Sequence, residues 1–256
     1  MQHLFTPAGE AALAAIMRRR PLLAFDFDGT LVPIVARPDD ARISQAVSSR
    51  LRILAARLPV AIVTGRAVSD VRGRLGFEPH YIVGSHGAED GLDAGAADAQ
   101  ARALDPLRDL LRLRGVNLAA AGIWVEDKVL SIALHYRLAR DPTGARGLID
   151  QLLAQPGRSV QVFGGKMVVN VMAPDAPDKA DAVRALVVRN GASCALFAGD
   201  DVNDEPVFVS APPDWLTVRI GRDDPSSRAR FFLDSPSEVA MLLERMLVLQ
   251  SRFDTL

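Results

Sequence analysis

The chain is short of several kinds of residue, and each shortage argues against a class of protein. Its 256 residues include a single cysteine, so no disulfide can form within the chain and we expect a reducing compartment. The 30 basic residues balance 31 acidic ones, whereas nucleic-acid and membrane-surface proteins usually need a basic excess. No run approaches the roughly 18 apolar residues of a membrane-spanning helix, and no signal-peptide pattern opens the chain. We expect a cytoplasmic monomer or weak homodimer that binds neither nucleic acid nor membranes.

Hydrophobic residues, by contrast, make up 49% of the chain and fall into short runs. Unbroken apolar runs of this length are typical of strands buried on both faces of a parallel sheet. These runs are residues 22–29, 59–66, 81–87, 194–201 and 216–221. Amphipathic helical patterns lie between them, at residues 41–58, 178–190 and 235–250. The alternation of strands and helices predicts an α/β fold built on a doubly wound parallel sheet.

Two of these helices carry end signals. Gly191 is expected to end the helix over 178–190, because glycine readily adopts the left-handed conformation found after helices. Ser235 and Glu238 have the spacing of a capping box and are expected to open the helix over 235–250.

The middle of the chain departs from the strand–helix alternation. A helical pattern is followed by two strand-like runs, and the same order then repeats. This pattern predicts a small α+β insert of about seventy residues, a normal size for a subdomain. We place it at residues 101–174, inserted into a core formed by residues 1–100 and 175–256. Trp124, in the first strand-like run of the insert, is expected to be a core residue.

Polar residues gather where the predicted strands of the core end. Asp26 and Asp28 follow the first strand, and Thr64, Gly65 and Arg66 follow the second. The other members of this group are His86 after the third strand, Lys179 at the start of a helix, and Asp200, Asp201 and Asp204 after the fourth strand. Ligands of parallel sheets bind beyond the carboxyl ends of the strands, so we expect these side chains to form one site.

Asp26 and Asp28 pose a question of charge. Residues two apart in a strand share a face, so the two carboxylates are expected to lie side by side and to repel each other. A divalent cation relieves that repulsion, and Mg²⁺ prefers oxygen ligands such as carboxylates, water and phosphate. Asp26 and Asp200 are expected to be direct ligands, with Asp201 or Asp204 holding a coordinated water.

The same residues suit the transfer of a phosphoryl group. Asp26 is expected to attack phosphorus as a nucleophile. Asp28 is expected to hold a proton, to donate it to the leaving oxygen and later to take one from the attacking water. Lys179, the Thr64 hydroxyl and the Gly65 N–H are placed to bind the phosphoryl oxygens. The sequence therefore predicts a phosphatase that works through an aspartyl phosphate.

The order of these motifs resembles the haloacid dehalogenase (HAD) superfamily of aspartyl-phosphate phosphatases. The motifs are DFDGT at 26–30, TGR at 64–66, Lys179 and GDDVNDE at 199–205. The resemblance implies a Rossmann-like core, a Mg²⁺ requirement and a cap domain inserted between the second and third motifs, where our insert falls. The metal site expected on this basis is formed by Asp26, Asp28, Asp200, Asp201 and Asp204.

A closer resemblance is to the trehalose-6-phosphate phosphatases of that superfamily. It rests on SHGAE at 85–89, VEDKVLSIALHYR at 125–137, GGKMVVNVMAP at 164–174 and DKADAVRALV at 178–187. By this resemblance, Glu126 and Lys128 are expected to hydrogen-bond the distal glucose, with Arg66 and His86 near the phosphosugar. It implies Mg²⁺-dependent hydrolysis of trehalose 6-phosphate, as in trehalose biosynthesis.

One departure from that family concerns the sugar. Family members usually carry Glu where this chain has Asn170, which keeps an acceptor oxygen but lacks the charge and is shorter. This departure leaves open, beside trehalose 6-phosphate, a different glycosyl phosphate as substrate, such as sucrose 6-phosphate, mannosyl-3-phosphoglycerate or glucosylglycerol phosphate. A separate alternative is a non-enzymatic phosphosugar sensor, since receiver-like modules also join aspartates, a hydroxyl and a lysine on a parallel sheet. Asp28 argues against the sensor, because a phosphoacceptor needs no second aspartate to cleave the acyl phosphate.

Overall fold

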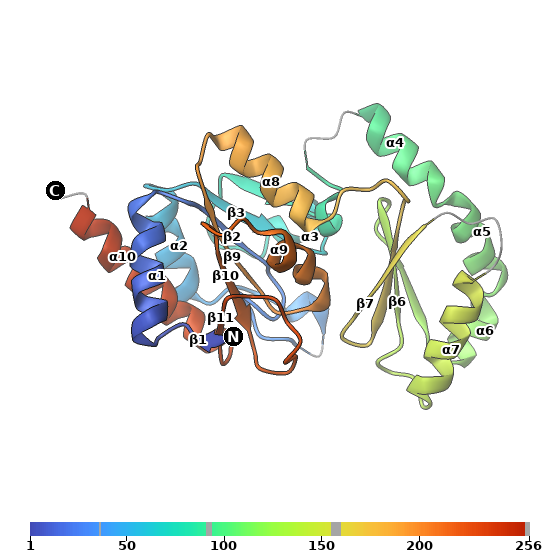
Figure 1. Cartoon of the computed structure of the whole chain (residues 1–256). Coiled ribbons are helices and arrows are strands. Elements are labelled where there is room, and N and C mark those ends of the chain that lie inside the picture. The colour runs from blue at the N-terminus through green and yellow to red at the C-terminus, as the bar shows by residue number, and fades with distance from the viewer. Residues whose placement is uncertain (36, 91–93, 155–159, 254–256) are drawn as a thin grey trace. The chain divides into compact units, whose positions relative to one another are not determined.

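The computed structural model describes residues 1–35, 37–90, 94–154 and 160–253 (Figure 1). The chain divides into two compact units, a core unit of Met1–Asp90 with Pro177–Leu256 and an inserted unit of Gly91–Ala176. The insert is wider than residues 101–174, because helix α4 (Ala94–Ala103) groups with the inserted unit. None of the helices in the described ranges combines the length and the apolar character that crossing a membrane requires.

The core unit is built on a seven-stranded sheet in which all neighbouring strands are parallel. In spatial order the strands are β1 (Gln2–His3), β11 (Phe231–Leu233), β10 (Leu216–Ile220), β9 (Ala195–Gly199), β2 (Leu22–Phe25), β3 (Val60–Val63) and β4 (Tyr81–Val83). All residues of β10, β9, β2 and β3 are buried, which explains why these segments lack an alternation of polar and apolar residues. The predicted doubly wound α/β fold is confirmed. The short strands β1 and β11 had no recognisable pattern in the sequence.

Helices cover both faces of this sheet (Figure 1). On one face, α10 (Val239–Phe253) packs against both α1 (Pro7–Arg18) and α2 (Gln45–Ala55). On the other face, α8 (Lys179–Asn190) packs on β2, β3 and the short helix α9 (Glu205–Ser210). A further short helix, α3 (Val68–Arg72), connects β3 to β4. Because the strands are parallel, the carboxyl ends of β9, β2, β3 and β4 all lie at the same edge of the sheet.

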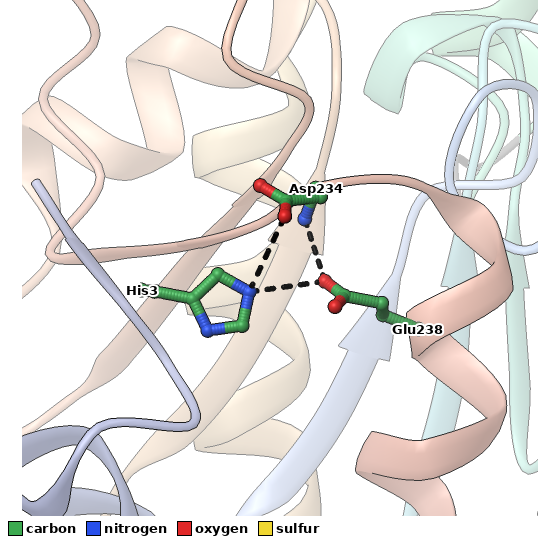
Figure 2. Close-up of side chains that lie close together, drawn as sticks. All are labelled: His3, Asp234 and Glu238. Carbon is green, nitrogen blue, oxygen red and sulfur yellow. Dashed lines mark hydrogen bonds and ion pairs between the residues drawn. The ribbon is translucent and has the colours of Figure 1, made fainter.

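The two predicted helix end signals had different outcomes. Gly191 follows α8 in the left-handed conformation, with a φ of 66°, as predicted. The capping box predicted at Ser235 is wrong: its side chain makes no capping hydrogen bond, and the 3-10 helix η4 (Pro236–Glu238) begins there. The Glu238 carboxylate instead accepts the N–H of Asp234 at 2.7 Å and lies 3.1 Å from His3 Nε2 (Figure 2). These contacts tie the first strand to the chain after β11.

Within its described residues, the inserted unit has an antiparallel sheet and four helices, which confirms the predicted α+β character. Its strands lie in the order β5 (Trp124–Asp127), β6 (Ser131–His135), β8 (Val168–Met172) and β7 (Gln161–Gly165). Besides α4, its helices are α5 (Asp105–Leu113), α6 (Gly115–Ala120) and α7 (Pro142–Leu153). Apolar side chains on one sheet face, such as Leu134 and Val169, pack with Leu107 of α5 and Ile149 of α7.

The opposite face of the inserted sheet carries polar side chains among apolar ones, and we name it the polar face. The cross-strand register pairs Trp124 with His135 and places Glu126, Ala133 and Asn170 in one row across three strands. Because side chains alternate along a strand, these residues share the face opposite the apolar one. Trp124 is 58% exposed, so the expectation that it is a core residue is wrong.

Candidate active site

A lysine and two aspartates from three separate elements form a buried cluster in the core unit. Asp26 directly follows β2, Lys179 is the first residue of α8, and Asp204 ends the 3-10 helix η3 (Val202–Asp204). The Lys179 ammonium donates to Asp26 Oδ1 and to Asp204 Oδ1, each at 2.7 Å. Lys179 is 1% exposed, Asp26 5% and Asp204 0%, so water does little to screen their charges. The structure thus brings together three residues that lie far apart in the sequence.

The local sequence explains how these groups reach one point. Asp178 caps α8 and forms a capping box with the third residue of the helix, which fixes where α8 starts. Gly199 leaves room for Asp204, because a Cβ at this glycine would lie 2.3 Å from Asp204 Cγ. Gly29 has a φ of +81°, and a Cβ there would lie 2.1 Å from Asp200 Oδ2. The glycines of the DFDGT and GDDVNDE motifs therefore allow two carboxylates to approach the backbone closely.

Burial and neighbouring charge oppose each other in this cluster. Burial raises the pKa of Asp26 well above its ordinary value, and the positive charge of Lys179 reduces this effect without cancelling it. Burial alone would lower the pKa of Lys179, but the attraction of Asp204 and Asp26 outweighs it, so that pKa is raised. The lysine therefore stays charged, and ionised Asp26 would be favoured by further positive charge.

Asp26, Asp200 and Asp204 are suited to hold a metal ion. One oxygen from each lies within 4.8 Å of the others. Lys179 donates to only two of these three buried carboxylates, and Mg²⁺ prefers such hard oxygen donors, so the donor set fits a divalent cation. Asp204 Oδ2 already accepts the N–H groups of Asp200 at 2.9 Å and Asp201 at 3.0 Å. Asp28 and Asp201, also predicted as ligands, are not members of this group of three.

Asp28 has a different partner from Asp26. Strand β2 ends at Phe25, so the alternation of side chains in a strand no longer applies at these two aspartates. Arg66 donates to both oxygens of Asp28, from Nε at 2.7 Å and from Nη2 at 2.8 Å. Instead of sharing a strand face, the two aspartates form separate pairs, Asp28 with an arginine and Asp26 with a lysine.

The segments after β3 and β4 meet closely. Thr64 is buried, and its Oγ1 accepts the N–H of Arg66 at 3.2 Å. His86 lies in the 3-10 helix η2 (Ser85–Gly87), is buried, and has a φ of 59°, which non-glycine residues seldom adopt. Gly65 lies against its ring, because a Cβ there would be 2.3 Å from His86 Cε1. Strained backbone of this kind is concentrated at functional sites.

On the polar face of the inserted sheet, Glu126 lies beside His135 and Lys128. Its Oε2 lies 3.0 Å from His135 Nε2 and 3.6 Å from Lys128 Nζ. Burial alone would raise the pKa of Glu126, but the hydrogen bond with His135 and the charge of Lys128 lower it. His135 also stacks on Trp124, with ring centroids 4.9 Å apart. His135 was not predicted from the sequence, and the β5–β6 register places it near Glu126.

A second group of residues, His3, Asp234 and Glu238, also has ligand atoms within 4.8 Å of one another. His3 Nδ1 accepts the N–H of Phe5 at 3.2 Å, so the ring proton sits on Nε2, which faces both carboxylates (Figure 2). A protonated nitrogen does not bind a metal. Asp234 also pairs with Arg222. We therefore interpret this group as a structural contact between the first strand and the chain after β11.

Comparison with known proteins finds relatives along most of the chain. The sequence model of the family described as trehalose-phosphatase matches residues 24–237. A protein of Mycolicibacterium paratuberculosis named trehalose-phosphate phosphatase is 34% identical over 247 residues, which cover 89% of this chain and 62% of that protein. The present chain thus spans less than two thirds of that relative's length.

Solved structures share the fold. The C-terminal domain of a trehalose-6-phosphate phosphatase from C. albicans matches with a TM-score of 0.76 at 22% identity, covering 94% of this chain and 97% of that one. A crystal structure of a trehalose-6-phosphate phosphatase related protein gives a TM-score of 0.71 at 24% identity, covering 90% and 99%. At these identities the likeness shows the fold alone.

Proposed function

The chain belongs to the trehalose-phosphatase family, and on that premise we propose that it hydrolyses trehalose 6-phosphate to trehalose and phosphate. The observation that carries the proposal is the buried cluster of Asp26, Lys179 and Asp204, with Asp200 beside it, where the parallel strands end. Such a cluster offers a nucleophile, a cation and oxygen ligands at one place, which phosphoryl transfer requires.

Asp26 is the proposed nucleophile. Its carboxylate attacks phosphorus as the bond to the sugar oxygen breaks, which leaves an aspartyl phosphate and the free sugar. Lys179, 2.7 Å from Asp26 Oδ1, offsets negative charge on the transferring group. The Thr64 hydroxyl and the Gly65 N–H are proposed to donate to the phosphoryl oxygens.

Asp28 is the proposed acid and base. In the first step its carboxyl group gives a proton to the sugar oxygen as that oxygen leaves. In the second step its carboxylate takes a proton from water as the water attacks the aspartyl phosphate, which releases phosphate and restores Asp26.

Mg²⁺ is the proposed cofactor, and the three-carboxylate group fits it. Asp26 and Asp200 are its proposed direct ligands, and the other proposed members of the site are Asp28, Asp201 and Asp204. When bound, Mg²⁺ supplies positive charge that stabilises the transferring phosphoryl group.

The polar face of the inserted sheet is proposed to bind the sugar. A carboxylate and an ammonium group, as in Glu126 and Lys128, accept from and donate to hydroxyl groups with charge-assisted hydrogen bonds. Asn170 lies in the same row of side chains as Glu126 and is the third proposed sugar-binding residue. Arg66 and His86 are also proposed to contact the phosphosugar.

The proposed setting is the cytoplasm. Cys194 is buried and free, which suits a reducing compartment. A sugar phosphate is the proposed small-molecule partner. A monomer or weak homodimer is the proposed state, and sedimentation equilibrium would check it.

Phosphate release from a substrate panel tests the function. Trehalose 6-phosphate, glucose 6-phosphate and sucrose 6-phosphate are compared with Mg²⁺ and with EDTA. We expect selective, Mg²⁺-dependent release from trehalose 6-phosphate, and no release from it would refute the proposed substrate. Asp26→Asn is expected to reduce turnover by about a thousandfold or more. Asp214→Asn, at an exposed ion pair with Arg19, is the matched control.

Asn170 and Ser131 favour a second candidate, a phosphatase of the same mechanism for a different glycosyl phosphate. Ser131 Oγ is buried and has no hydrogen-bond partner in the described part of the chain, and the register places it on the same face as Asn170. The neutral Asn170 amide and Ser131 hydroxyl would then face the sugar where family members usually have the carboxylate of a Glu. A preference in the panel for another glycosyl phosphate, shifted toward trehalose 6-phosphate by Asn170→Glu, would establish this candidate.

A further inference from the structure

A line of alternating charges runs through helix α3 and ends on Asp28. Arg66 donates to both oxygens of Asp28, at 2.7 Å and 2.8 Å. Its Nη1 donates to Asp70 Oδ2 at 2.8 Å, so a second carboxylate holds another edge of the guanidinium. Arg74 Nε donates to Asp70 Oδ1 at 2.9 Å, and its Nη2 also pairs with that oxygen. The line therefore consists of Asp28, Arg66, Asp70 and Arg74.

The far end of this line is anchored on the backbone. Arg74 is buried and donates from Nη1 to the carbonyl oxygens of Pro38 at 3.2 Å and Asp39 at 2.8 Å. Arg66 also lies over the ring of Phe27, with its Cζ 5.3 Å from the ring centroid. A planar guanidinium that is held at its edges and stacked on a ring has a single favoured orientation. It therefore holds the carboxylate in front of it in one place.

The same contacts leave Arg66 little capacity for a substrate. A guanidinium has five N–H donors. Arg66 uses them in two hydrogen bonds to Asp28, one to Asp70 and one to the carbonyl oxygen of Pro38, at 3.0 Å. Four of the five donors are therefore engaged, two of them with Asp28, and one N–H remains for the proposed contact with the phosphosugar.

We propose that Asp70 is a positioning residue for the acid–base carboxylate of Asp28, acting through the guanidinium of Arg66, and that Arg74 holds Asp70 in place. This inference rests on the proposed function, in which Asp28 gives a proton to the sugar oxygen. Proton transfer needs the two oxygens within hydrogen-bond reach, and a misplacement of about 1 Å can lower a rate about a hundredfold. Without Asp70, the guanidinium loses one of the two carboxylates that orient it.

The decisive comparison applies Asp70→Asn to two substrates that differ in their need for an acid. The alkoxide leaving from a sugar phosphate needs a proton, whereas p-nitrophenolate leaves readily without one. The ratio kcat/KM covers the steps up to leaving-group departure and excludes the later hydrolysis of the aspartyl phosphate. We expect kcat/KM for trehalose 6-phosphate to fall about tenfold or more, and that for p-nitrophenyl phosphate to fall far less. An equal fall on both substrates would overturn the proposal.

A double-mutant cycle tests whether Asp70 acts through Asp28. In an Asp28→Asn background, Asp70→Asn is expected to cause no further loss of kcat/KM on trehalose 6-phosphate. Losses that multiply independently would contradict the proposal. Arg72→Gln is the matched control on the same helix, because Arg72 is 57% exposed and pairs with Glu78. It is expected to leave kcat/KM unchanged on both substrates.

Folding and substrate identity are checked separately. Urea unfolding shows whether Asp70→Asn is folded under assay conditions. Arg66→Lys provides an independent test, because lysine keeps the charge but cannot bridge two carboxylates with a fork of donors. It is expected to show the same selective loss. If wild-type protein prefers another sugar phosphate in the panel, the proposed substrate is wrong, and the comparison is made with that sugar phosphate, where a selective loss would still support the positioning role.

Discussion

Lys179 donates a hydrogen bond to Asp26 at 2.7 Å, and both side chains are almost completely buried. A buried ion pair contributes little net stability, because removing two charges from water offsets most of their attraction. Removing one partner is much worse, since it leaves a buried charge without compensation. The pair is therefore better explained by the chemistry of the site than by the stability of the fold.

Replacing the lysine tests this interpretation. Lys179→Met is expected to lower the free energy of unfolding by about 3–5 kcal/mol, because Asp26 and Asp204 lose their shared donor. Urea denaturation in EDTA measures the loss. Lys166→Met, at an exposed position, is the control and is expected to stay within about 0.5 kcal/mol of wild type. A Lys179→Met protein as stable as wild type would contradict the uncompensated-charge argument.

Mg²⁺ is expected to raise the Tm of the wild-type protein, because a ligand that binds only the folded state stabilises it. Asp200→Asn removes a proposed ligand and is expected to abolish most of this shift, together with activity. Asp234→Asn removes a carboxylate of the His3 group and is expected to leave the shift unchanged. Differential scanning fluorimetry with and without Mg²⁺ gives the comparison. The opposite pattern for the two variants would place the metal at His3, Asp234 and Glu238 instead of at the proposed site.

Gly65 and Gly73 form a matched pair of glycine tests. Gly65→Ala puts a Cβ 2.3 Å from His86 Cε1, so the buried ring must shift. We expect a loss of about 1–3 kcal/mol in the free energy of unfolding and a fall in kcat/KM. Gly73 has helical φ and ψ and no atom within 4 Å of an added Cβ, so Gly73→Ala is expected to stabilise by about 0.4–1 kcal/mol. Thermal and urea unfolding of both variants would show whether the signs differ.

Glu126→Ala separates sugar binding from phosphoryl chemistry. It is expected to raise KM for trehalose 6-phosphate about tenfold or more, because a hydrogen bond to a charged group is worth about 1.5–3 kcal/mol. The kcat/KM for p-nitrophenyl phosphate is expected to stay within about twofold, since that substrate has no sugar. Asp109→Ala, at an exposed ion pair on α5, serves as the control. Equal losses on both substrates would mean that Glu126 does not contact the sugar.

Asp70 predicts a pH dependence of stability. Burial alone would raise its pKa, but the hydrogen bonds and charges of Arg74 and Arg66 outweigh this and hold the pKa below its ordinary value of 3.8. A depressed folded-state pKa contributes stability above the unfolded-state value, and that contribution is lost as the pH falls through the folded-state pKa. Asp70→Asn is therefore expected to show a shallower loss of stability as the pH falls from about 5 through the folded-state pKa of Asp70. If the free energy of unfolding falls with pH equally steeply in wild type and Asp70→Asn, Asp70 does not contribute to the acid sensitivity of the fold.

Local patterns in the sequence were enough to assign the parallel sheet, the inserted α+β unit and most of the residues at the carboxyl ends of the strands. Strand and helix periodicity are properties of neighbouring residues, and parallel strands bring their carboxyl ends to one edge whatever their order. Asp26 and Lys179 could therefore be assigned to one site although 153 positions separate them.

Pairing between side chains needed the folded chain. Asp28 was expected beside Asp26, but β2 ends before both, and Asp28 pairs with Arg66 instead. Arg66, Asp70 and Arg74 lie four residues apart, which is the spacing of ion pairs on a helix, but this spacing does not show that Arg66 also holds Asp28. In the inserted unit, Trp124 was expected to be buried, whereas the β5–β6 register sets it on the polar face against His135. Strand ends, register and helix placement are set by packing across the whole chain, and they decide which charges meet.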